Sequence, residues 1–124
     1  MDWNSGVPID DASIPLWVRI EECMRLLDVA LSQAKQRGKN MVDRECEYYT
    51  AKSTECFELL EAGYANTFIQ QVIKGRPKVA QAMALYHAAE VEYKNANEAI
   101  NAMKAKLRVL ENEYEREWEQ SKRM

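Results

Sequence analysis

The fold is decided by residues 77–121, which read PKVAQAMALYHAAEVEYKNANEAINAMKAKLRVLENEYEREWEQS. Along this stretch an apolar or aromatic residue recurs at alternating intervals of three and four, which is the pattern of a coiled-coil seam. The seam positions are Val79, Ala82, Tyr86, Ala89, Tyr93, Ala96, Ile100, Met103, Leu107, Leu110 and Tyr114. Because neither Gly nor Pro follows Pro77, the pattern predicts one helix over 77–121, roughly 65 Å long at 1.5 Å per residue. A helix of this length with one apolar face needs a partner to cover that face.

The preceding part of the chain predicts helices over 14–37 and 40–62, with a weak point between them at Gly38. The chain can bend there or continue, because a lone Gly inside a helix costs only about 1 kcal/mol relative to Ala. A short helix over 66–74 follows, and Gly75 and Pro77 end it. The recurring positions that define the apolar face of the first two helices are Ile20, Cys23, Leu27, Ala30, Ala34, Val42, Cys46, Tyr49, Ser53, Cys56 and Leu60.

These elements predict an all-α fold with a long C-terminal coiled-coil helix. Residues 14–62 span nearly the same length as residues 77–121, so the simplest arrangement is a long antiparallel helical hairpin. If the chain bends at Gly38, the result is an elongated three-helix bundle instead. In both arrangements one helical domain, residues 14–124, follows an irregular N-terminal arm over residues 1–13.

The composition narrows the class of protein. The chain has 124 residues, 47% of them hydrophobic, and a net charge of −3, which excludes the weakly hydrophobic, highly charged class that stays disordered. It contains no apolar run of the ~20 residues needed to span a bilayer, so no membrane association is expected. The acidic N-terminus does not resemble a signal peptide. We therefore expect a cytoplasmic protein whose three cysteines are small buried residues and not disulfides.

No constellation of residues in the sequence predicts catalysis. The only histidine, His87, has Glu90 on the same helical face, but a carboxylate-bridged metal pair needs a Glu-x-x-His from each of two helices. No pair of cysteines has zinc-ligand spacing, and no glycine-rich phosphate loop is present. We therefore predict no catalytic residue, no metal site and no cofactor, and a protein that is not an enzyme.

Basic residues give one candidate site, for nucleic acid. If residues 62 and 77 flank the turn, an antiparallel hairpin places residue 35 opposite residue 104 and residue 38 opposite residue 101. Two basic triplets would then lie side by side and could hold a phosphate backbone. They are Lys35, Arg37 and Lys39, and Lys104, Lys106 and Arg108. The alternative is a solvated face that neighbouring glutamates neutralise, which the net negative charge favours.

The C-terminal turns give a second candidate site, for protein. Tyr114 and Trp118 lie one turn apart among acidic residues, with Glu111 and Glu115 beside them. A tryptophan on a thin helical tip is hard to bury within one short chain. Either the arm covers it with Trp3, Val7 and Ile9, or another protein does, and a second copy of the chain in a homodimer is one such partner. In the second case Trp118 would anchor the complex, a role in which Trp is enriched.

Three stretches carry a family resemblance: AKSTECFELLEAG, GRPKVAQA and AEVEYKNANEAINAMKAKLRVLENEYEREW. Over about residues 42–120 the chain resembles small all-helical accessory proteins of tailed phages and prophages. The resemblance implies a phage accessory factor in the host cytoplasm, acting in DNA metabolism or against a host defence, and it implies no catalytic residue. We therefore expect a non-enzymatic interaction protein, an adaptor or an inhibitor, that binds a host or phage protein. The alternative is a nucleic-acid-binding accessory protein of phage recombination or replication.

Overall fold

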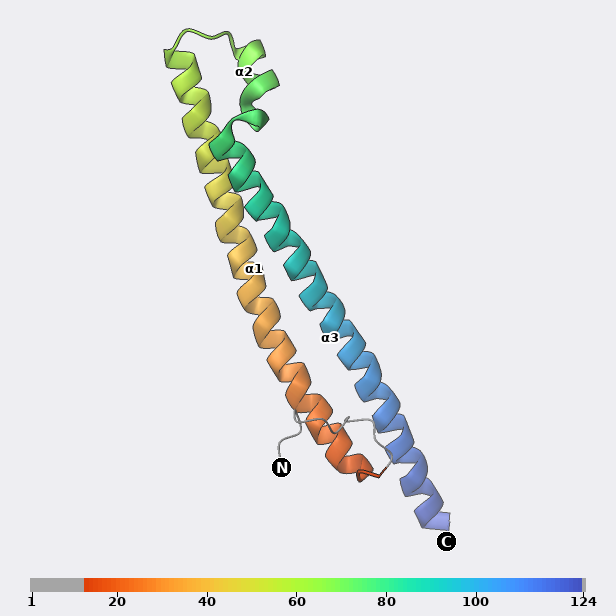
Figure 1. The fold of residues 1–124 in the computed structure, drawn as a ribbon. Helices are drawn as coiled ribbons and strands as arrows, with labels where there is room; N and C mark the ends of the chain where they lie inside the picture. The colour runs from red at the N-terminus through yellow and green to blue at the C-terminus, as the bar shows by residue number, and fades with distance from the viewer. Residues whose placement is uncertain (1–12, 124) are drawn as a thin grey trace. The chain divides into compact units, whose positions relative to one another are not determined.

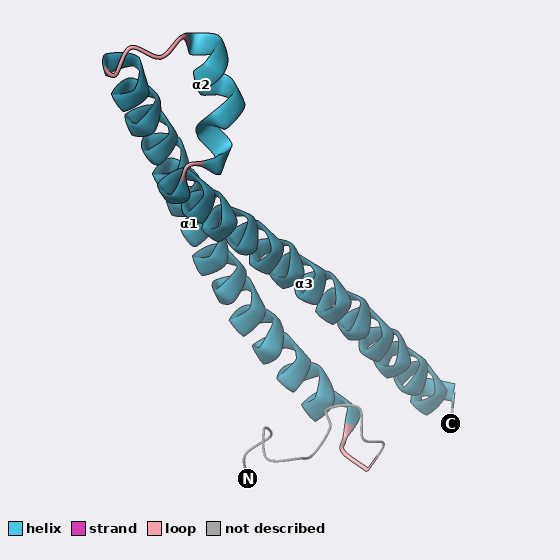
Figure 2. Ribbon diagram, turned by 45° about the horizontal axis from the view of Figure 1, so that its top comes forward, coloured by secondary structure: helices cyan, strands magenta, loops and turns pink. Residues whose placement is uncertain are grey.

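The computed structural model describes residues 13–123, where helices joined by short turns and loops are the only regular secondary structure (Figures 1 and 2). They are α1 (Leu16–Glu61), α2 (Asn66–Val72), the 3₁₀ turn η1 (Ile73–Gly75) and α3 (Pro77–Arg123). The all-α class and the hairpin of long helices are confirmed, since α1 packs against the oppositely directed α3. The predicted N-terminal arm falls almost entirely on residues 1–12, which lie outside the described residues. No described helix combines the length and the apolar composition needed to cross a bilayer.

The helix α1 runs through Gly38 without interruption, where the sequence had predicted two helices. The three-helix alternative, which needs a bend there, is therefore not the observed fold. Gly38 lies against the ring of Tyr93, and a Cβ at Gly38 would stand 3.0 Å from the Cε1 of that ring. The glycine thus leaves room for the Tyr93 ring of α3 to lie against α1, which explains its presence in a helix interior without a hinge.

The chain forms two compact units, to each of which α1 and α3 both contribute. One unit comprises residues 13–33 and 96–123, and its core consists of Leu16, Cys23 and Leu110 with Ile20, Met103 and Leu107 packed around them. The Cys23 thiol lies 3.7 Å from the Met103 carbonyl oxygen, and burial raises its pKa.

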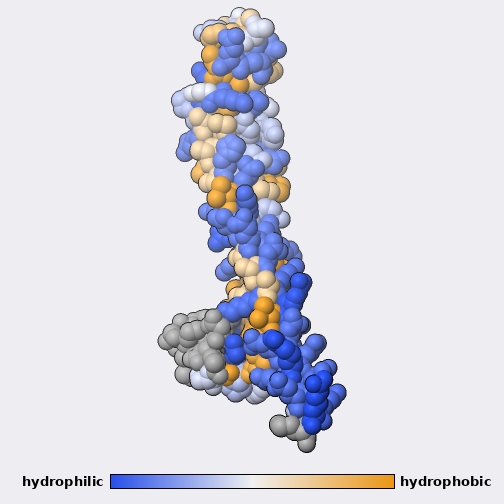
Figure 3. Space-filling model, turned by 90° about the vertical axis from the view of Figure 1, so that its right-hand side faces the viewer, coloured by the Kyte–Doolittle hydropathy of each residue, from blue (hydrophilic) through white to orange (hydrophobic). Residues whose placement is uncertain are grey.

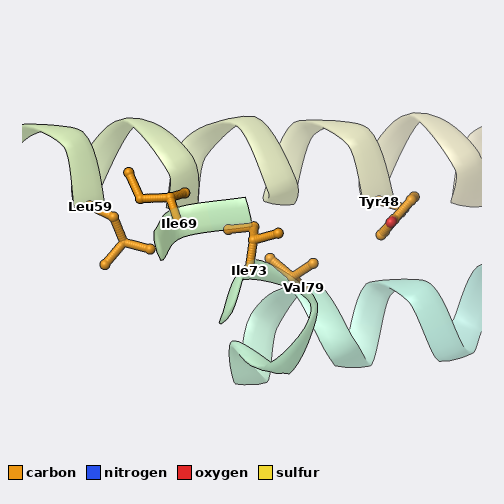
Figure 4. Close-up of a cluster of buried hydrophobic side chains, with 5 residues drawn as sticks. All are labelled: Tyr48, Leu59, Ile69, Ile73 and Val79. Atoms are coloured by element: carbon orange, nitrogen blue, oxygen red, sulfur yellow. The ribbon is translucent and has the colours of Figure 1, made fainter. Parts of the chain in front are cut away.

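The other unit comprises residues 34–95, and the connection between the long helices supplies part of its core. Gly63 ends the turn after α1 in the left-handed conformation (φ 93°), and the Tyr64 amide donates back to the Leu59 carbonyl at 3.2 Å. The chain then folds back so that α2 and η1 bury Ile69 and Ile73 almost completely. Figure 4 shows how the buried side chains of this cluster gather from α1, the connection and the start of α3: Tyr48, Leu59, Ile69, Ile73 and Val79.

The seam predicted on α3 is confirmed by burial. Ten of its eleven positions are buried or half-buried, and the exception is Tyr114, which is 45% exposed. The small seam residues Ala82, Ala89 and Ala96 are among those covered.

The seam predicted on the second half of α1 is wrong by one residue. Of the six predicted positions, only Cys56 is half-buried, and Val42, Cys46, Tyr49, Ser53 and Leu60 are exposed. The positions that face inward instead are Met41, Glu45, Tyr48, Lys52, Glu55 and Leu59. Hydrophobicity alone misses this face because polar side chains on it have partners in the structure: Tyr86 donates a hydrogen bond to Glu45, and Arg76 donates to Glu55.

The pair of Glu55 and Arg76 joins α1 to the start of α3. Arg76 donates from Nη2 at 2.8 Å and from Nε at 3.1 Å to the same Glu55 oxygen, and the Glu55 side chain is only 8% exposed. The hydrogen bond from Arg76 holds the pKa of Glu55 below its ordinary value, and the same bond raises the pKa of Arg76.

We expect Arg76→Met to lower the melting temperature by several degrees at pH 7, because it leaves a buried carboxylate without its partner. A carboxyl whose pKa is lowered on folding stabilises the fold above its unfolded pKa, near 4.3, and that contribution is lost as pH falls through the folded pKa. The difference in melting temperature between wild type and variant should therefore shrink below about pH 4. Arg44→Met is the matched control, since Arg44 pairs with Glu47 on the exposed surface of α1. Equal losses for the two variants, or a loss at pH 7 that persists at pH 3, would contradict this role of Arg76.

A second experiment tests the close approach at Gly38. In a Tyr93→Ala background, Gly38→Ala should stabilise the protein by about 1 kcal/mol, the ordinary gain in helix propensity. With Tyr93 present, the contact with the ring should cancel or reverse that gain, so urea unfolding of the four proteins should show coupling between the two sites. If Gly38→Ala stabilises equally in both backgrounds, the glycine does not serve this packing.

Candidate protein-binding site

Three of the four residues predicted to bind protein gather around one pocket in the unit of residues 13–33 and 96–123. This pocket of about 350 Å³ is lined by Trp17, Ile20, Glu21, Glu111, Tyr114 and Glu115. We call it the acidic aromatic pocket. Two aromatic side chains and one isoleucine supply its apolar surface, and three carboxylates supply its charge.

Two helices contribute to the pocket with the same spacing. Trp17, Ile20 and Glu21 stand at positions i, i+3 and i+4 of α1, so they share one helical face, and Glu111, Tyr114 and Glu115 repeat this spacing on α3. The first turn of α1 begins where the Pro15 carbonyl accepts hydrogen bonds from the amides of Val18 and Arg19, both at 3.1 Å.

The neighbouring core residues hold this face in place. Leu16 and Leu110 are buried between the helices, at 8% and 2% exposure. Trp17 directly follows Leu16 and is 57% exposed, and Tyr114 lies one turn beyond Leu110 and is 45% exposed. The pocket therefore forms where the packed seam ends and the aromatic side chains are left partly uncovered.

The charge and shape of the pocket favour a cationic ligand group beside an apolar one. Carboxylates attract Lys and Arg and accept their charge-assisted hydrogen bonds. The faces of Trp and Tyr bind the same cations with about 0.5–1 kcal/mol at exposed sites. Phosphate groups, in contrast, would be repelled by three carboxylates.

Trp118, the fourth predicted residue, is not among the side chains that line the pocket. It is 56% exposed, and the Lys122 ammonium lies 5.6 Å from the centre of its ring. In Figure 3 the C-terminal turns of α3 are mostly hydrophilic. In the sequence, Trp118 is flanked by Glu117 and Glu119. The alternative in which Trp3, Val7 and Ile9 cover Trp118 lies outside the described residues.

The residues of the α1 half of the pocket were missed by sequence reasoning. Ile20 was predicted only as a seam position, and neither Trp17 nor Glu21 was predicted to belong to a site. The repeated i, i+3, i+4 spacing of an aromatic or aliphatic residue with glutamate was the available signal. It could not be used without knowing which turn of α1 faces residue 114.

The two basic triplets are divided between the two units. Lys35, Arg37 and Lys39 belong to the unit of residues 34–95, and Lys104, Lys106 and Arg108 belong to the other. The predicted pairing that placed them opposite one another is wrong, because residue 38 lies against Tyr93 and not against residue 101. Arg37 itself pairs with Glu92 at 3.2 Å.

The remaining candidates for chemistry are dispersed. His87 is 63% exposed, and its Nδ1 lies 3.0 Å from a Glu90 oxygen. Among residues 13–123, no three His, Cys, Asp or Glu side chains are placed to share a metal ion. All three cysteines are free thiols. The expectation that they are buried is confirmed for Cys23, whereas Cys56 is half-buried and Cys46 is exposed because of the one-residue shift of the α1 seam.

We compared the chain with protein-family models, with curated proteins and with solved structures, and it matches none of them.

Proposed function

We propose that this protein is a non-enzymatic helical interaction protein that binds another protein through the acidic aromatic pocket. The observation that carries the proposal is the meeting of two half-exposed aromatic side chains, Trp17 and Tyr114, within a rim of three carboxylates. The resemblance to phage accessory proteins supports a host or phage protein as the partner, and hence a role as an adaptor or an inhibitor in infection.

The proposal follows from where binding energy concentrates in protein interfaces. Trp and Tyr are the residues most enriched at energetically dominant positions, especially when they sit in pockets that a partner can close. The Glu21, Glu111 and Glu115 carboxylates around them would select a partner segment that presents Lys or Arg beside an apolar side chain. Nucleic acid is disfavoured at this pocket, because its phosphates would meet these carboxylates.

The test is capture of the partner by tagged protein from bacterial lysate, followed by affinity measurement with the recovered protein. Trp17→Ala combined with Tyr114→Ala should weaken binding tenfold or more, because each position contributes as an anchor. Leu85→Ala combined with Val91→Ala is the matched control, since these apolar side chains of α3 are equally exposed but lie in the other unit. Trp118→Ala should have a smaller effect, because Trp118 does not line the pocket.

Charge provides a second readout. Replacing Glu21, Glu111 and Glu115 by Gln should slow association and flatten its dependence on salt while leaving the shape of the pocket unchanged. Two results would overturn the proposal: capture that disappears when the lysate is treated with nuclease, or a large fall in melting temperature in the Trp17 and Tyr114 variant. The first would move the function to the basic residues, and the second would show that the aromatic side chains belong to the core.

A further inference from the structure

The unit of residues 34–95 carries an apolar helix face that neither α2 nor α3 covers. The second half of α1 has the spacing of a coiled-coil seam twice, one residue apart: the inner set packs in the hairpin, and the outer set faces away. We call the outer set the outer stripe, and its members are Val42, Cys46, Tyr49, Ser53, Cys56 and Leu60. Four of them, with Lys52 and Phe57, line a shallow groove along α1.

The outer stripe and Phe57, which lines the groove beside it, expose large apolar side chains. Val42 is 53% exposed, Tyr49 54%, Phe57 62% and Leu60 51%. A side chain of this size that is half exposed offers about 100 Å² to a partner, so the four together offer about 400 Å². Since interfaces are about 57% apolar, this corresponds to about 700 Å² on each partner, close to the ~800 Å² of a standard interface.

We propose that a second copy of this chain covers the outer stripe, with the two α1 helices antiparallel and residue i facing residue 102 − i of the second copy. The stripe is symmetric about residue 51, so this register uses all six of its positions. Val42 faces Leu60, Cys46 faces Cys56, and Tyr49 faces Ser53, each pair occurring twice in the dimer.

The sizes of the side chains favour this orientation over a parallel one. In the antiparallel register the largest side chain of the stripe, Tyr49, meets one of the smallest, Ser53, so large and small groups interdigitate. In a parallel, in-register dimer Tyr49 would face Tyr49 and Ser53 would face Ser53, which crowds one layer and leaves a void in the next. The inference is independent of the proposed function, because the acidic aromatic pocket belongs to the other unit.

The two cysteines of the stripe make the orientation testable in the full chain. They stand ten residues apart, about 15 Å along one helix, so a shorter bismaleimide linker cannot join them within one copy. In the antiparallel dimer the linker joins Cys46 to Cys56 of the second copy. Cys46→Ser alone and Cys56→Ser alone should therefore each lose the cross-linked dimer, and an equimolar mixture of the two variants should regain it. In a parallel dimer each single variant would still cross-link, which would overturn the proposed orientation.

Association without a linker is measured by sedimentation equilibrium across a wide range of concentration. Wild type should shift from monomer to dimer with concentration, and Tyr49→Glu should remain monomeric at concentrations where wild type is dimeric. Val91→Glu, at an equally exposed position on α3, is the control and should dimerise like wild type. Circular dichroism should show unchanged helicity in both variants, because neither side chain is in the core.

A wild type that stays monomeric, or a Tyr49→Glu variant that dimerises normally, would overturn the proposal. Tyr49→Glu should still bind a partner through the acidic aromatic pocket, so the two proposals can fail separately.

Discussion

The return of the chain between residues 62 and 76 is the constraint on which the arrangement of the second unit depends. Burial of Ile69 and Ile73 against Leu59 holds α2 and η1 on the inner face of the last turns of α1. This part of the inner face is therefore already covered before α3 begins. As a result Arg76 forms its ion pair with Glu55 instead of with a residue at the end of α1, and this ion pair holds α3 in this register. The stacking of Tyr86 on Tyr48 and the approach of Tyr93 to Gly38 belong to the same register. The pairing predicted from the sequence, in which residues 62 and 77 flank the turn, would have brought different residues of α1 and α3 together in this unit.

This register also determines which side of α1 remains exposed. Because α1 carries apolar residues on two adjacent faces, either could have packed against α3. The face that packs includes Glu45, Lys52 and Glu55, and the face that stays open includes Val42, Tyr49 and Leu60. Covering the more polar face is possible because Arg76, just before α3, pairs with the buried carboxylate of Glu55, and Tyr86 of α3 donates to the half-buried carboxylate of Glu45. The apolar face left open is then available to another chain.

The contrast between the two long helices explains how much of this fold could be predicted. On α3 the seam runs through eleven apolar or aromatic positions in sequence, so periodicity alone identified both the helix and its buried face. On the first half of α1 the predicted seam positions are likewise buried or half-buried, but on the second half the same reasoning chose the more apolar of two faces and was wrong, because hydrophobicity does not record that a glutamate has an arginine partner. Gly38 was ambiguous for a related reason: its value lies in a contact with Tyr93, and a contact between distant residues leaves no local pattern.

In the candidate site, too, local features of one helix could be predicted, whereas contacts between the two helices could not. Glu111, Tyr114 and Glu115 were found from the sequence, because an aromatic residue among charges on one helix is a local feature. Their partners Trp17 and Glu21 could not be found in this way, because recognising them requires knowledge of how α1 pairs with α3 in that unit.

The acidic aromatic pocket and the outer stripe also differ in physical character. Binding at the acidic aromatic pocket depends on three carboxylates and should weaken as salt screens them, whereas the outer stripe is uncharged at all six of its positions and should be insensitive to moderate salt. The salt dependence of any association of this protein therefore indicates which of the two surfaces is responsible.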